Sequence, residues 1–144
     1  MLKVIVTSHG PLAEALLGSA RMVYGDLPGT SHVGLSEGAG IEAFKQDFAD
    51  ELQRVSAGAD GVLVLCDMLC GTPYNVACRH AFDPQSPVPI AVVTGVNFPM
   101  LLMSAELLEG KDVQQAAQEL VAQAGEAIAI AIARPAVAAQ LDDF

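Results

Sequence analysis

Strand-like and helix-like segments alternate along this chain, and this alternation constrains its fold more than any other feature. Apolar runs typical of strands occupy residues 3–8, 31–35, 61–66 and 88–94. Each run is followed by apolar residues at helical spacing, in residues 12–24, 41–55, 74–82 and 99–108. Repeated strand–helix units are typical of a parallel sheet with helices on both faces. We therefore expect an α/β fold with a doubly wound, mainly parallel sheet.

Within the third and fourth strand-like segments, residues 62–65 and 90–93 are apolar without a break, which is typical of strands buried on both faces. A doubly wound sheet of order 2-1-3-4 places the first and third strands side by side, with the topological switch point between them. Residues that follow these two strands then meet at one edge of the sheet. That edge is where open α/β sheets bind ligands.

The pattern changes after Gly110. Residues 112–124 predict one more helix, and residues 127–133 then alternate alanine with isoleucine. A period of two favours a strand, although an alanine-rich stretch could also extend the helix. Such a last strand could lie antiparallel at an edge of the sheet or be exchanged with another subunit. We expect one domain over residues 1–133 and a loosely ordered tail over residues 134–144.

Bulk properties limit the class of protein. The 144 residues suit one domain with a full core, and the mean hydropathy is +0.42. No apolar run reaches the roughly 18 residues that span a bilayer, and the N-terminus lacks the features of a signal peptide. We therefore expect a cytoplasmic protein without membrane insertion.

The cysteines Cys66, Cys70 and Cys78 are odd in number and are interpreted as reduced, buried thiols. Their spacing to each other and to His80 fits no usual zinc site, so no metal is expected.

The charge is strongly one-sided, with seven basic and seventeen acidic residues and a formal net charge of −10. Binding to nucleic acid or to anionic membranes needs a basic surface, so we expect neither as a partner. An acidic surface suits docking to proteins with basic faces.

Three loops follow predicted strands at the expected edge of the sheet. The first carries His9 and Gly10, the second runs from Asp67 to Pro73, and the third spans residues 94–99. His9 ends the first strand just before a helix, and imidazole is a nucleophile near neutral pH. Because neighbouring strands are about 4.8 Å apart, the carboxylate of Asp67 can reach one ring nitrogen of His9. That hydrogen bond would fix the tautomer and leave the other nitrogen free to attack phosphorus.

A transferred phosphoryl group also needs hydrogen-bond donors. Backbone amides at two helix starts, after Gly10 and around Gly71 and Thr72, are suited to this, with the Thr72 hydroxyl as a further donor. None of the three loops contains Lys or Arg. Thr72 is also the expected N-cap of the helix that begins at Pro73.

Each signal also has a structural explanation. A histidine after a strand is often structural, an aspartate can cap a turn, and Gly-Thr-Pro often marks only a helix start. His32 and His80 are interpreted as structural or solvent-exposed, and Met100 and Met103 as packing residues. A non-catalytic module that binds a small anion stays open as an alternative. A dinucleotide site is not expected, because no G-x-G-x-x-G follows the first strand.

The chain resembles the IIA proteins of the mannose family of the bacterial sugar phosphotransferase system. The resemblance rests on Ser8-His9-Gly10, on Asp67 with the stretch from Gly71 to Ala77, and on the stretch from Gly95 to Leu101. It implies a doubly wound α/β sheet whose antiparallel last strand is exchanged across a homodimer.

The resemblance further implies a phosphorelay without a cofactor. The phosphocarrier protein HPr would donate a phosphoryl group to His9, which would pass it to a IIB protein during sugar uptake, while Asp67 orients His9. The family usually has glycine where this chain has Cys70. No fused IIB domain is recognised, so a separate IIB acceptor is expected. A relay or regulatory subunit of the dihydroxyacetone kinase type shares the fold and the histidine, and is the alternative within the same chemistry.

Overall fold

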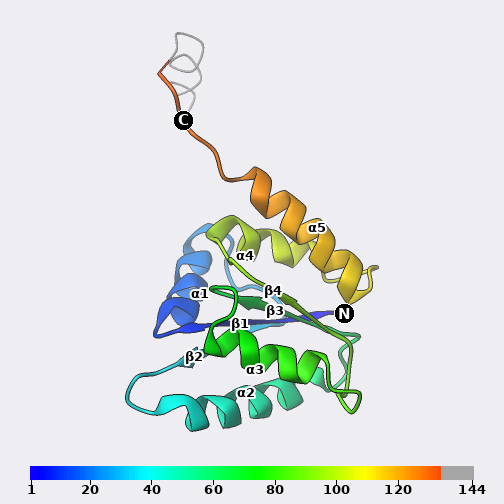
Figure 1. The fold of residues 1–144 in the computed structure, drawn as a ribbon. Coiled ribbons are helices and arrows are strands. Elements are labelled where there is room, and N and C mark those ends of the chain that lie inside the picture. The colour runs from blue at the N-terminus through cyan, green and yellow to red at the C-terminus, as the bar shows by residue number, and fades with distance from the viewer. Residues whose placement is uncertain (134–144) are drawn as a thin grey trace.

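One parallel sheet forms the centre of the molecule (Figure 1). The structure is a computed structural model of the chain, and it describes residues 1–133. Its strands are β1 (Lys3–His9), β2 (Thr30–Leu35), β3 (Val62–Cys66) and β4 (Ile90–Val93). They lie in the order β2-β1-β3-β4, and every neighbouring pair is parallel. The predicted fold class and strand order are confirmed.

Helices cover both faces of the sheet. Helices α2 (Gly40–Ser56) and α3 (Thr72–Ala81) pack on one face. On the other face lie α1 (Leu12–Val23), α4 (Phe98–Ser104) with a 3₁₀ turn (Ala105–Leu107), and α5 (Val113–Glu126). The fold is therefore a three-layer α/β arrangement.

The central strands are buried on both sides, which explains their unbroken apolar sequence. In β3, Leu63 and Leu65 join the core under α1, α4 and α5, whereas Val62 and Val64 join the core under α2 and α3. All five residues of this strand are buried. Alternate side chains of a strand point to opposite faces, so both faces must be apolar.

The register of β1 and β3 determines which residues meet at the carboxyl edge of the sheet. Thr7 pairs with Cys66, and the Asp67 N–H donates a hydrogen bond to the Thr7 carbonyl at 3.2 Å. His9 is the last residue of β1, so the two chain segments leave the sheet next to each other.

Several local expectations are corrected. Thr72 is not the N-cap of α3: Gly71 holds that position, Thr72 is the first helical residue, and no side chain caps this helix. Cys66 is buried as predicted, but Cys70 is exposed because it lies in the loop after β3, outside the core. The second strand begins one residue earlier than predicted, so His32 is the third residue of β2.

The segment after α5 forms no strand within this single chain. Residues 128–133 are neither helical nor paired with a strand of the described part, and they extend away from the body of the molecule (Figure 1). Ile128 is 77% exposed and Ile130 is 84% exposed. A strand needs a neighbour for its backbone groups, so exchange with a second copy stays a prediction. The tail predicted over residues 134–144 lies outside the described residues. Within residues 1–133, none of the helices has the length and apolar character needed to cross a bilayer.

Candidate active site

His9 and Asp67 form a hydrogen-bonded pair at the carboxyl edge of the sheet. The Asp67 Oδ2 atom lies 2.8 Å from His9 Nδ1 and accepts the His9 backbone N–H at 2.9 Å. The other carboxylate oxygen, Oδ1, accepts the Met68 N–H at 2.9 Å. The carboxylate side chain is 12% exposed, whereas the histidine side chain is 45% exposed. A mostly buried acid thus holds a ring that solvent can reach.

This geometry determines which ring nitrogen is free. A carboxylate only accepts hydrogen bonds, so the proton of a neutral His9 ring lies on Nδ1. The lone pair of a neutral ring then lies on Nε2. A ring nitrogen with a free lone pair can act as a nucleophile near neutral pH.

The pKa of Asp67 lies below its usual range. Burial acts to raise this pKa, but hydrogen bonds from the His9 backbone and ring outweigh it, aided by the charge of His9 and by the Met68 N–H. Asp67 is therefore a carboxylate at neutral pH. It can stabilise positive charge that develops on the imidazole.

The loop that carries His9 is held from two sides. The Gly10 N–H donates to the Leu35 carbonyl at 2.7 Å, which ties the loop to the end of β2. The buried Ser8 hydroxyl oxygen accepts the Ala13 N–H at 2.8 Å, which ties it to the first turn of α1. Gly10 itself has a φ of +58°, a conformation that glycine adopts at little cost.

The start of α3 lies directly against the His9 ring. A Cβ placed on Gly71 would be 2.7 Å from His9 Cε1 and 3.3 Å from Nε2. Only glycine therefore fits at this position without moving the ring. The structure brings together the predicted residues His9, Gly10, Asp67 and Gly71, with Thr72 as the next residue of the helix.

The third predicted loop has a different arrangement. The Asn97 side chain accepts the Met100 N–H at 2.8 Å and donates to the Ala124 carbonyl at 3.3 Å. It caps α4 and joins that helix to α5. None of its described hydrogen bonds reaches His9.

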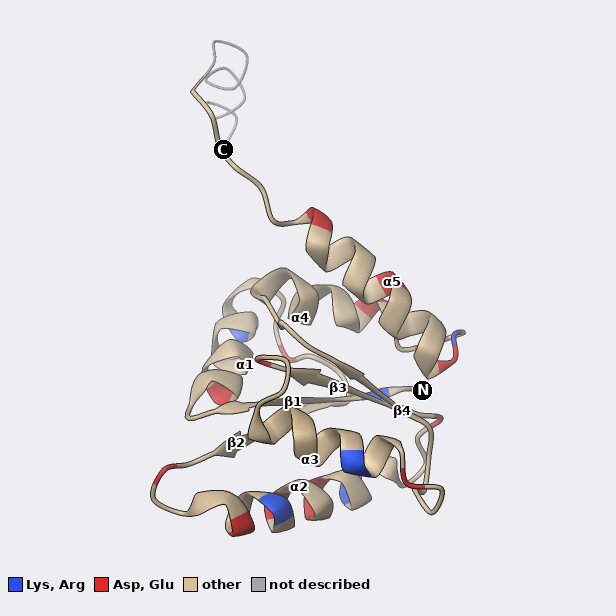
Figure 2. Ribbon diagram, in the orientation of Figure 1, with Lys and Arg blue, Asp and Glu red and all other residues tan. Residues whose placement is uncertain are grey.

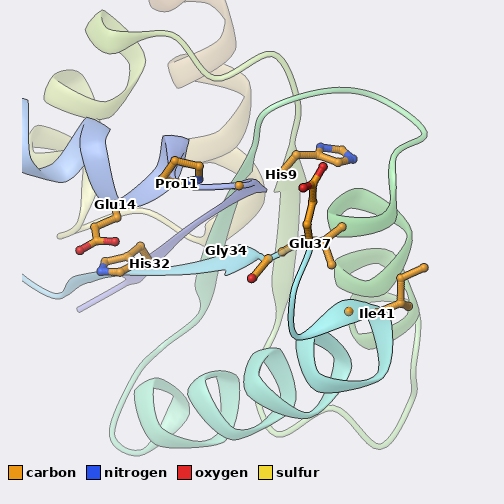
Figure 3. A pocket seen from close by; sticks show the side chains of 11 residues that line it. His9, Pro11, Glu14, His32, Gly34, Glu37 and Ile41 are labelled. Atoms are coloured by element: carbon orange, nitrogen blue, oxygen red, sulfur yellow. The ribbon is translucent and has the colours of Figure 1, made fainter.

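A groove of about 930 Å³ opens beside His9, between the start of α1 and the segment that links β2 to α2 (Figure 3). His32 and Glu37 line it, and sequence reasoning missed both. His32 faces the groove from the middle of β2, and only the exact strand register would have revealed this. The other lining residues are Gly10, Pro11, Glu14, Gly34, Leu35, Ser36, Gly40 and Ile41.

Comparisons with known proteins agree on one family. The family model described as "PTS system fructose IIA component" matches residues 3–127. The mannose-specific EIIAB component of Escherichia coli K12 is 32% identical over 123 residues, covering 85% of this chain and 36% of that protein. This chain therefore spans about a third of that relative.

Two further proteins match over most of their length. The sorbose-specific EIIA component of Klebsiella pneumoniae is 33% identical over 129 residues, covering 85% of this chain and 89% of that protein. A solved mannose/sorbose-specific IIA subunit from Enterococcus faecalis superposes with a TM-score of 0.79 at 29% identity. That superposition covers 92% of this chain and 96% of the solved one.

Proposed function

The chain belongs to the mannose-family IIA components of the sugar phosphotransferase system, and from this premise we propose that it carries a phosphoryl group on His9. HPr is the donor, and a IIB protein is the acceptor during sugar uptake. This role implies a cytoplasmic location. The observation that carries the proposal is the 2.8 Å contact between Asp67 Oδ2 and His9 Nδ1, because it leaves Nε2 free in a half-exposed ring.

In the transfer step, Nε2 of His9 attacks phosphorus. The bond between Nε2 and phosphorus forms as the bond between phosphorus and the donor atom breaks, and the electron pair of that bond leaves with the donor. The His9 ring keeps its proton on Nδ1 and gains positive charge, which Asp67 stabilises. Transfer to the IIB protein reverses this sequence, with the acceptor atom as the nucleophile.

The phosphoryl oxygens bind to backbone amides in this proposal. The N-terminus of α3, at Gly71 and Thr72, lies against the ring that bears the phosphoryl group. Helix N-termini bind anions through free N–H groups and the helix dipole. The turn at Gly10, which has a positive φ, borders the phosphoryl group in this proposal, while its own N–H donates to the Leu35 carbonyl. Moderate binding through amides suits a carrier that must release its cargo.

The proposed working form is a homodimer in which two copies exchange residues 127–133. Support comes from Ile128, Ile130 and Ile132, which stand at every second position and are 77%, 84% and 50% exposed in a single chain. Pairing with a second copy would bury them and satisfy the backbone.

Intact-mass measurement after incubation with phosphoenolpyruvate, enzyme I and HPr tests the carrier role. We expect an acid-labile gain of one phosphoryl group, lost in His9→Ala. The matched control is His80→Gln, because His80 packs against Phe48 within the α2–α3 layer, with ring centroids 5.5 Å apart. This variant should still be labelled. A gain that survives in His9→Ala, or no gain in the unaltered chain, would refute the proposal.

A further inference from the structure

A buried hydroxyl group directly precedes His9 in the chain. Ser8 is 0% exposed, and its Oγ accepts the Ala13 N–H at 2.8 Å and donates to the Gly10 carbonyl in a longer hydrogen bond of 3.4 Å. The N-cap position of α1 is held by Pro11, which has no side-chain group that could cap the helix. The Ser8 hydroxyl therefore satisfies an amide in the first turn of α1 from outside the helix. It links the backbone on both sides of His9 to the start of α1.

The turn after His9 is also held against β2. Ser8 pairs with Gly34 in the register of β1 and β2, and the Gly10 N–H donates to the Leu35 carbonyl at 2.7 Å. A Cβ placed on Gly34 would be 2.7 Å from the Gly10 carbonyl oxygen, closer than such atoms approach in proteins. Because the neighbour is backbone, a side chain at position 34 would push the turn away from β2. Glycine permits this close approach, since it has no Cβ.

No lysine or arginine is present at this edge of the sheet to bind a phosphoryl group. The loops that leave β1, β2 and β3 at the carboxyl edge carry acidic and uncharged residues only (Figure 2). In the proposed function the phosphoryl oxygens therefore bind to backbone amides, whose directions the local backbone determines. A misplacement of about 1 Å between reacting groups can lower a rate steeply. Contacts that fix the backbone around His9 should therefore influence the rate of phosphorylation.

We infer that Ser8 and Gly34 are positioning residues for the phosphorylation of His9. The inference rests on the proposed function. Asp67 sets the rotation of the His9 ring through the contact of 2.8 Å with Nδ1. Ser8 and Gly34 act one step further back, through the backbone from which the ring extends. Ser8 links this backbone to α1, and Gly34 leaves the space that the Gly10 carbonyl needs beside β2.

Ser8→Ala tests the first contact, because it removes the hydroxyl that joins the turn to α1. The matched control is Ser104→Ala: Ser104 is 1% exposed, and its hydroxyl donates to the Leu101 carbonyl at 2.6 Å within α4. Both variants lose a buried hydroxyl, but only one of them loses a contact to the turn after His9. In Ser8→Ala we expect the maximal single-turnover rate of transfer from phosphorylated HPr to fall about tenfold. The HPr concentration that gives half of this rate should stay unchanged, and Ser104→Ala should keep the full rate.

Gly34→Ala tests the second contact without removing a hydrogen bond. Its Cβ would displace the Gly10 carbonyl, so we expect a loss of rate of similar size. Gly18→Ala is the matched control, because nothing lies within 4 Å of its Cβ position in α1. Nitrogen NMR of the chain labelled with ¹⁵N-histidine gives a second readout. The ring signals of His9 should shift in Ser8→Ala and Gly34→Ala and stay in place in both controls.

Phosphoramidate, a small phosphoryl donor with no protein surface, separates positioning from binding of the donor. We expect the same fractional loss of rate with phosphoramidate as with phosphorylated HPr. A loss confined to HPr would assign the two residues to donor binding and overturn the inference, and so would an equal loss in the controls. A full rate with unshifted His9 signals in either variant would overturn the role of that residue.

The two donors also separate this inference from the proposed function. If HPr does not label the unaltered chain, the proposed donor is wrong. Slower labelling of His9 by phosphoramidate in Ser8→Ala and Gly34→Ala would then still support the positioning role. If HPr labels the unaltered chain and both variants at the same rate, only the positioning role fails. Should Ser8→Ala not fold, Gly34→Ala carries the test.

Discussion

The two walls around His9 are built differently. The wall formed by Asp67 and Gly71 is tight: the carboxylate lies 2.8 Å from the ring, and no room exists for a Cβ at Gly71. The opposite wall is an open groove of about 930 Å³ lined by Glu14, His32 and Glu37. The tight wall sets the orientation of the His9 ring, whereas the open wall leaves the ring accessible to solvent.

Backbone pairing explains the difference. Asp67 and Gly71 follow β3, which pairs directly with β1, so the register of the sheet determines their positions relative to His9. Glu37 lies between β2 and α2, and its side chain is exposed. We therefore expect substitutions in the tight wall to alter the rate of His9 phosphorylation. Substitutions in the open wall should instead alter the binding of partner proteins.

The largest effect is expected for Asp67→Asn. The amide keeps the size of the side chain but has no negative charge to stabilise the imidazolium. Because an amide can donate as well as accept a hydrogen bond, it also no longer fixes the proton of the neutral ring on Nδ1. We expect the rate of His9 phosphorylation by HPr to fall on the order of a hundredfold, measured by rapid-quench labelling. Asp83→Asn, in the exposed turn after α3, is the control and should keep the full rate. An unchanged rate of phosphorylation in Asp67→Asn would show that the Asp67 carboxylate does not contribute to phosphoryl transfer.

Gly71→Ala should have the next largest effect. The new Cβ would lie within 2.7 Å of His9 Cε1, so the ring must shift away from the start of α3. We expect about a tenfold slower transfer, because small misplacements of reacting groups lower rates steeply. Gly125→Ala is the matched control, since nothing lies within 4 Å of its Cβ position in α5. Equal rates in both variants would show that the ring tolerates displacement.

Acid should reduce the stability difference between the unaltered chain and Asp67→Asn. The folded-state pKa of Asp67 lies below its unfolded value. Its ionised form therefore stabilises the fold above the unfolded pKa, and this contribution disappears as the pH falls through the folded pKa. Urea unfolding at neutral and acidic pH measures the difference. A difference in the free energy of unfolding that grows as the pH falls would contradict a lowered pKa of Asp67 in the folded state.

The smallest effect is expected for Cys70→Gly. Cys70 has a φ of +63°, which is strained for a residue with a side chain. Glycine should therefore raise the free energy of unfolding by about 1 kcal/mol, measured by denaturant titration. Cys70→Ala keeps the Cβ and should leave stability unchanged. Equal stability of the glycine and alanine variants would show that the loop relaxes without strain.

The sequence predicted what depends on hydrophobic pattern and strand order. Continuous apolar runs identified β1 and β3 as buried strands, and their adjacency brought His9 and Asp67 together. These features follow from the two-residue period of strands and from parallel pairing, which local sequence shows.

What depends on exact backbone geometry was not predicted. The groove needs the register that places His32 in its lining, and the cap of α3 needs the φ and ψ angles of Gly71. The conformation of residues 127–133 was left open by the sequence, and the described part of the chain offers them no strand with which to pair. Such properties arise from tertiary contacts that no local pattern encodes.

The most direct test of the account is to identify the ring nitrogen that carries the phosphoryl group. After phosphorylation by HPr, nitrogen NMR of the chain labelled with ¹⁵N-histidine separates the two ring positions. The hydrogen bond from His9 Nδ1 to Asp67 predicts phosphorylation at Nε2, with a proton retained on Nδ1. A phosphoryl group on Nδ1, or an unmodified His9, would contradict the account.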